Sequence, residues 1–121
     1  MKLQHMSAGS VFSKELFHRE GSTLLRSLAK RMGLAKGSFQ VRSNKAGDAV
    51  YGEVTLHAET FYVQLRVDGY PQIRGTESSP VKVLYRSCKG LKDYTGSYNQ
   101  WIALKDVLLD LDGFSHTLKA L

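Results

Sequence analysis

The chain has little cysteine and no long apolar runs, and each shortage excludes a class of protein. Cys88 is the single cysteine among 121 residues, so an internal disulfide and a metal cage of several thiolates are both excluded. A lone thiol is typical of a reducing compartment, and we therefore expect a cytoplasmic protein. No run approaches the roughly 20 apolar residues that a membrane-spanning helix needs, and the first residues lack the apolar segment of a signal peptide. We therefore expect no membrane partner.

The sequence also lacks the motifs that catalysis, metal binding and cofactor binding require. Residues 90–97 (GLKDYTGS) superficially resemble a phosphate-binding loop, but five residues separate the glycines where the motif has four, and no Lys-Ser/Thr pair follows. The histidines do not have the spacing of metal ligands; they are His5, His18, His57 and His116. We therefore predict no catalytic residue, no metal and no cofactor, and an enzyme is disfavoured.

Three smaller features have an ordinary explanation beside a chemical one. Cys88 has basic neighbours that favour a nucleophilic thiolate, but a free thiol that fills a small gap is the more common case. Asp106 and Asp110 are spaced to share one helix face, where solvation explains them better than metal binding or acid–base chemistry. His57 lies on the polar side of a predicted strand, which predicts a solvated ring.

Length and composition indicate one globular domain. With 42% hydrophobic and 10% aromatic residues, the chain is long enough to bury a core without disulfides. Residues 1–6 contain a second methionine, and we interpret them as a cloning remnant or a disordered tail. Residues 7–121 are then expected to form a single α+β domain.

Acidic residues are scarce over much of the chain. The formal net charge is +6, and residues 22–46 and 80–92 contain no acid at all. Residues 102–121 reverse the sign, with three aspartates against two lysines. A basic body of this kind attracts polyanions, which include nucleic acid, anionic lipid and acidic protein surfaces.

Hydrophobic periodicity predicts a helix, several strands and a second helix. Apolar residues at helical spacing predict the first helix over 22–32, capped by Ser22, with Gly21 ending the preceding segment and Gly33 ending the helix. Helical spacing returns at 104–111, and Gly113 is expected to interrupt that helix. Alternation predicts strands over 39–42, 50–57, 61–67 and 81–86. The short segments 72–74 and 100–104 are candidates for further strands.

The connections favour an α+β fold. Short turns are expected at 43–48 and 68–71, and consecutive strands joined by short turns pair antiparallel. We expect an antiparallel sheet of three to five strands flanked by an N-terminal and a C-terminal helix, in the order α-β-β-β-(β)-α, with one face covered by the helices. Tyr85 and Trp101 are expected to pack in the core.

The stretch 81–101 carries the strongest functional signal, because basic residues and tyrosines are interleaved along it. Its lysines and arginine can neutralise phosphates, and its tyrosines can stack on bases. Two cations of the first hairpin extend this surface if the two loops lie at the same end of the sheet. The ordinary explanation is that the lysines keep an edge strand soluble. The candidate nucleic-acid-binding residues are Arg42, Lys45, Arg86, Lys89, Lys92, Tyr94 and Tyr98.

Two functions fit these residues. The first is nucleic-acid binding, to DNA or RNA, through charge and stacking and without strong sequence specificity. The second is a protein-interaction module or inhibitor that uses the same loop against an acidic partner, because Tyr, Trp and Arg also dominate protein interfaces. Unpaired sheet edges offer a route to a homodimer, and the oligomeric state is left open.

Overall fold

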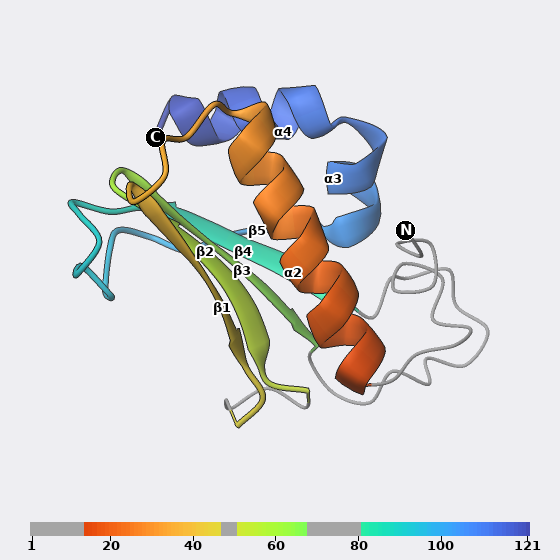
Figure 1. Cartoon of the computed structure of the whole chain (residues 1–121). Coiled ribbons are helices and arrows are strands. Elements are labelled where there is room, and N and C mark those ends of the chain that lie inside the picture. The colour runs from red at the N-terminus through yellow and green to blue at the C-terminus, as the bar shows by residue number, and fades with distance from the viewer. Residues whose placement is uncertain (1–13, 47–50, 68–80) are drawn as a thin grey trace.

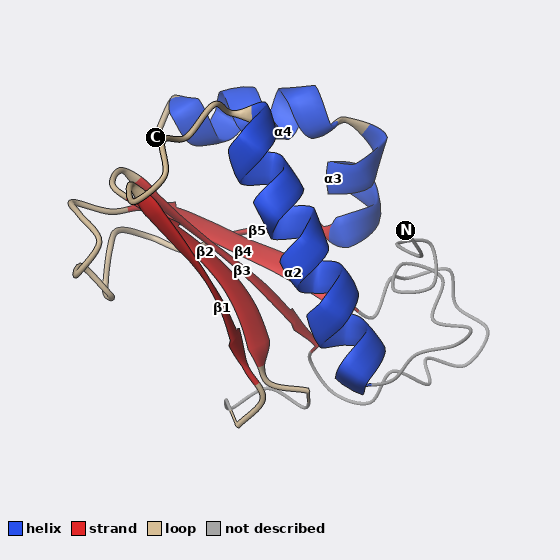
Figure 2. Cartoon of the chain, in the orientation of Figure 1, coloured by secondary structure: helices blue, strands red, loops and turns tan. Residues whose placement is uncertain are grey.

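The computed structural model describes residues 14–46, 51–67 and 81–121, and these form an α+β domain (Figures 1 and 2). The expected features at 1–6, 68–71 and 72–74 lie outside the described residues. The elements follow in the order α2 (Lys14–Arg31), β1 (Phe39–Asn44), β2 (Glu53–Ala58), β3 (Phe61–Val67), β4 (Val81–Ser87), β5 (Gln100–Ala103), α3 (Leu104–Leu109) and α4 (Leu111–Lys119). The α+β class and the position of the strands between helices are thus confirmed.

The five strands form one antiparallel sheet in which each strand pairs with its sequence neighbours, in the order β1-β2-β3-β4-β5. Strand β3 alternates between buried and half-buried residues over 61–67, as predicted. Strand β1 continues to Asn44 and β2 begins at Glu53, so the turn between them starts later than expected. A sheet of this order needs only short hairpin connections.

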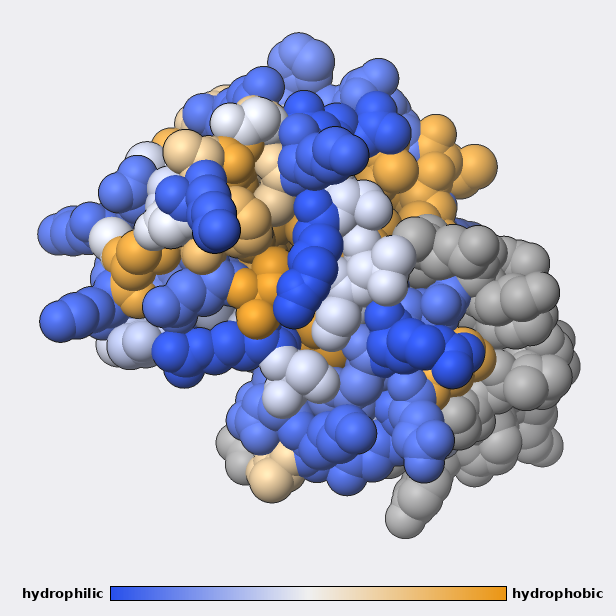
Figure 3. Space-filling model, in the orientation of Figure 1, coloured by the Kyte–Doolittle hydropathy of each residue, from blue (hydrophilic) through white to orange (hydrophobic). Residues whose placement is uncertain are grey.

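The helices of the described part all lie on one face of this sheet, where α2 crosses the strands and α3 and α4 pack beside it (Figure 1). Phe17, Leu25 and Leu28 of α2 are buried in one core with Leu56 and Val63 of the sheet. Burying each such side chain stabilises the fold by about 1.5–3 kcal/mol. Hydrophilic residues cover most of the visible described surface, and hydrophobic residues show in separate smaller patches, one of them at the upper right over the region of α3 (Figure 3).

Helix α2 is longer than the sequence pattern predicted, since it begins by Lys14 and runs through Gly21 and Ser22. Gly21 is buried, and a Cβ at this position would lie 3.2 Å from side-chain atoms of both Leu65 and Val54. The glycine therefore allows the helix to approach the sheet closely and does not end a segment. The predicted C-terminal stop is confirmed: Gly33 has φ 72°, and its amide donates to Lys30 O.

The C-terminal helical region is broken at Asp110, three residues before the predicted interruption at Gly113. Asp110 is the N-cap of α4, and its Oδ1 accepts a hydrogen bond from Gly113 N at 2.9 Å. Asp106 lies in α3, so Asp106 and Asp110 do not share a helix face as predicted. No helix within the described residues is long and apolar enough to cross a membrane.

Candidate functional site

The sheet face that points away from the described helices carries polar, basic and aromatic side chains. Residues paired across neighbouring strands lie on the same face of a sheet. The strand register therefore identifies the residues of this face, which is here called the open face. Its central row crosses all five strands and consists of Arg42, Thr55, Gln64, Leu84 and Trp101. The next row consists of Gln40, His57, Tyr62 and Arg86, and the third of Asn44, Glu53, Arg66, Lys82 and Ala103.

Trp101 belongs to this open face, so its predicted place in the core is wrong. Its side chain is 50% exposed, and it pairs with Leu84 in the central row. Because side chains alternate along β5, Ile102 faces the helices. Leu104, at the start of α3, is the residue next to β5 that is fully buried in the core. Tyr85 does pack on the core as predicted, with its ring edge-on to Phe114 at 5.4 Å.

The β4–β5 connection, residues 88–99, is a folded loop organised by Asp93. The Asp93 carboxylate accepts hydrogen bonds from the amides of Gly96 at 3.0 Å, Lys89 at 2.9 Å and Thr95 at 3.2 Å, and from the Thr95 hydroxyl. These bonds, with those from the Gly96 and Lys89 amides foremost, hold the pKa of Asp93 well below its usual range. Asp93, the one acid of this loop, thus stabilises the loop conformation by binding its backbone amides.

Arg86 ties the same loop to the sheet. Its guanidinium lies over the Tyr62 ring at 4.3 Å and donates to Tyr94 O at 2.8 Å and to Asn99 Oδ1 at 3.0 Å. The hydroxyl oxygens of Ser87 and Ser97 lie 2.6 Å apart across the base of the loop. Arg86, predicted as a phosphate contact, therefore already has protein partners and sets the position of Tyr94.

Tyr94 closes one side of a shallow pocket of about 430 Å³ on the open face. The Tyr94 and Tyr62 rings each meet the His57 ring edge-on at 5.3 Å, and His57 Nε2 lies 3.0 Å from Gly90 O. His57 is consequently only 4% exposed, whereas the sequence pattern predicted a solvated ring. The pocket is lined by Gln40, Arg42, Ser43, Asn44, Glu53, Thr55, His57, Tyr62 and Tyr94.

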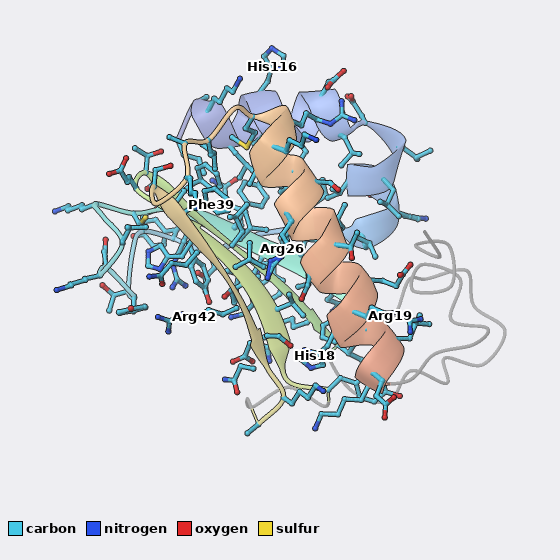
Figure 4. The ribbon with its side chains drawn as sticks, viewed as in Figure 1. His18, Arg19, Arg26, Phe39, Arg42 and His116 are labelled. Carbon is cyan, nitrogen blue, oxygen red and sulfur yellow. The ribbon has the colours of Figure 1, made fainter. Side chains whose placement is uncertain are left out.

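The predicted candidate residues are brought together only in part. Arg42 projects from β1 on the side away from α2 (Figure 4) and lines the same pocket as Tyr94. Lys89 and Lys92 line a neighbouring hollow of about 450 Å³ on the loop. Tyr98, from the same loop, is 92% exposed.

Lys45 does not join this group. In a sheet of sequential hairpins, successive connections lie at alternate ends, so the β1–β2 turn and the β4–β5 loop are at opposite ends. The condition that both loops share one end, on which the extension to Lys45 depended, is not met. Lys45 instead lines a hollow near the start of α2, with Glu15, His18 and Arg19.

His18 is the centre of a second polar cluster, between α2 and the first hairpin (Figure 4). Its Nε2 lies 2.6 Å from Tyr51 O, which can only accept, so Nε2 carries the proton. The Ser43 hydroxyl then donates to Nδ1 at 2.6 Å. Burial lowers the pKa of His18, partly offset by the Tyr51 carbonyl. Both ring nitrogens are thus used to join α2 to β1 and to Tyr51, which lies just before β2.

Cys88 is half-buried, and its Sγ donates to Ala58 O at 3.3 Å. Burial raises the pKa of this thiol and outweighs the lowering by the Gly90 backbone and by Arg86. This favours the ordinary explanation, a thiol that fills a small gap, over a nucleophilic thiolate. No group of three or more His, Cys, Asp or Glu side chains in the described part of the chain is arranged to hold a metal ion.

The open face and the loop 88–99 therefore combine three kinds of group. Exposed cations can bind anions, exposed rings can stack on flat apolar surfaces, and nearly buried polar groups in the pocket can form hydrogen bonds. Comparisons with protein-family models, with curated proteins and with solved structures find no match for this chain.

Proposed function

We propose that this protein binds single-stranded nucleic acid through the open face and the loop 88–99. The observation that carries the proposal is the exposure of Tyr94, Tyr98 and Trp101, the first of them 56% exposed, along one segment beside Lys89 and Lys92. Large rings left exposed along one segment suit a binding surface. The lone cysteine supports a cytoplasmic location for this function.

The chemistry of the surface suits a flexible polyanion with flat side groups. Lysines and arginines neutralise phosphates, and each base stacked on an aromatic ring contributes roughly 1–3 kcal/mol. A duplex hides the faces of its bases, so stacking requires unpaired bases. The surface therefore favours a single strand over a duplex. Contacts of this kind carry little sequence information.

A fluorescence titration tests this proposal, because Trp101 is the single tryptophan and lies on the open face. We expect a single-stranded oligonucleotide to quench Trp101 fluorescence and to bind more tightly than a duplex of equal length. With three phosphates neutralised by Arg42, Lys89 and Lys92, the slope of log affinity against log salt should be about −2. Polyphosphate, which lacks bases, should leave the fluorescence nearly unchanged.

Two outcomes would contradict the proposal. Absence of oligonucleotide binding at low salt would exclude nucleic acid and would favour the alternative, an acidic protein partner on the same loop. Equal quenching by polyphosphate and by oligonucleotide would exclude stacking on Trp101 and reduce the interaction to charge alone.

A further inference from the structure

The pocket between β1, β2 and Tyr94 has a hydrogen-bond acceptor in its floor that no described residue uses. His57 Nε2 lies 3.0 Å from Gly90 O. A carbonyl oxygen only accepts, so Nε2 carries the proton, and in the neutral ring Nδ1 is an acceptor. No donor to Nδ1 is present among residues 14–46, 51–67 and 81–121. This nitrogen belongs to a side chain that is more than nine-tenths buried and lines the pocket.

Thr55 adds a second group of the same kind. Its side chain is 9% exposed, lines the pocket and has no hydrogen-bond partner within the described ranges. Among side-chain nitrogens and oxygens in those ranges, Arg86 Nε is fully buried and has no partner. The unpartnered atoms of Thr55 and His57 are not fully buried, so they keep some contact with solvent, and both residues line the pocket. Polar groups this buried are normally paired. Two such groups in one floor point to a ligand with a polar edge.

The walls and rim indicate a flat ligand that is attached to a negative charge. Tyr62 and Tyr94 supply aromatic walls, and the rim carries Arg42, an exposed cation that has no ion-pair partner in the described part. The volume of about 430 Å³ falls within the roughly 300–1,000 Å³ of small-ligand pockets. A heterocycle linked to a phosphate fits this combination of walls, floor and rim.

We propose that this pocket holds one nucleobase of a bound strand. The Thr55 hydroxyl and His57 Nδ1 hydrogen-bond the edge of the base, Tyr94 packs against its face, and Arg42 contacts the adjoining phosphate. The base must offer an N–H to His57, since Nδ1 accepts only. This inference rests on the proposed function. It adds a site that requires a base and that recognises the hydrogen-bonding groups on the edge of that base.

Threonine-to-valine substitution tests the pocket without disturbing the strand. Thr55→Val removes the hydroxyl and keeps the shape, and Thr55→Ser restores a hydroxyl. The measurement is the ratio of the Kd for a base-free deoxyribose–phosphate strand to the Kd for an oligothymidylate of the same length. In the wild type we expect this ratio to be about tenfold or more. Thr55→Val should lower the ratio severalfold at an unchanged salt slope, and Thr55→Ser should largely keep it.

A second ligand tests the acceptor. Methylation at N3 of thymine removes the N–H that His57 Nδ1 would accept, so oligo-N3-methylthymidylate should bind severalfold more weakly than oligothymidylate. Ratios that do not change in Thr55→Val, or equal binding of the N3-methylated and unmethylated strands, would overturn the pocket and leave the proposed function standing. Equal binding of the base-free strand would overturn base stacking too, and with it the proposed function. Failure of every strand to bind would overturn both. The circular dichroism spectrum of each variant verifies that it is folded, so a lower ratio of the two Kd values cannot be mistaken for unfolding.

Discussion

His18 shows how a single buried side chain can make the stability of this protein depend on pH. Burial lowers its pKa from the ordinary 6.5, Lys45 and Lys14 add to the effect, and the Tyr51 carbonyl opposes it. Below pH 6.5 the unfolded chain therefore binds a proton that the folded chain resists. The contribution of His18 to stability is complete above that pH and is lost as the pH falls through the lowered pKa.

We predict that the melting temperature falls between pH 7.5 and pH 5, and that His18→Gln makes this dependence flatter. The variant should also be less stable at pH 7.5 by about 1–3 kcal/mol, because Ser43 and Tyr51 lose their partner. Thermal unfolding followed by circular dichroism at several pH values measures both effects. His116→Gln, at an exposed position, is the control. A His18→Gln profile as steep as that of the wild type would contradict the prediction.

Asp93 matters at the same scale, because one carboxylate satisfies several donors of the loop 88–99. We predict that Asp93→Asn loosens this loop, since an amide has one accepting oxygen and its NH₂ group opposes the inward-pointing N–H groups. Hydrogen exchange at the Lys89 and Gly96 amides should become faster, and single-stranded oligonucleotides should bind more weakly. Asp106→Asn is the matched control, because Asp106 is exposed in α3. Unchanged exchange at Gly96 would exclude this role for Asp93.

Helix α2 owes its position on the sheet to a residue without a side chain. A methyl group at Gly21 would already lie 3.2 Å from Leu65 and Val54, so a larger group has no room unless the helix moves. We predict that Gly21→Leu lowers the free energy of unfolding by about 1–3 kcal/mol. Denaturant unfolding measures this loss, and Ser27→Leu, at an exposed position of the same helix, is the control. Equal stability of the two variants would show that helix–sheet spacing does not depend on Gly21.

The elements that the sequence predicts well are those whose pattern has one local cause. Strand β3 alternates without interruption and its bounds are predicted correctly. The end of α2 follows from Gly33, whose positive φ most other residues avoid. Helix α3 ends where the Asp110 carboxylate caps the next helix, and an aspartate three residues before a glycine is a weak signal among three nearby aspartates.

The candidate site is less predictable, because its important contacts join segments far apart in the sequence. His57 is buried by Gly90 and Tyr94, which follow it by more than 30 residues, so its strand alone predicts a solvated ring. The exposure of Trp101 depends on the register of β5 against β4, and hydrophobicity alone favours the core. The basic and aromatic content of 81–101 did identify the loop and its rings. It could not show that Arg86 holds the loop while Arg42, exposed on the open face, has no ion-pair partner among the described residues.

At the scale of the whole molecule, the separation of the two sheet faces makes a prediction that net charge alone does not. The helices of the described part cover one face, while the open face and the loop 88–99 carry the exposed rings. Lys89→Glu with Lys92→Glu lowers the formal net charge from +6 to +2, by two units for each substitution. Arg26→Glu with Lys105→Glu lowers it equally, on exposed positions of α2 and α3.

If oligonucleotides bind at the open face, these two variants must differ although their net charges are equal. We predict that the loop variant loses nearly all measurable affinity, because two phosphate contacts are replaced by repulsion. The helix variant should lose only the long-range attraction, about tenfold or less at physiological salt, since exposed charges more than about 8 Å apart are screened. Both variants should keep the melting temperature of the wild type within a few degrees. Equal loss in the two variants would mean that the strand follows overall charge, and a large fall in stability of the loop variant would mean that Lys89 and Lys92 support the fold.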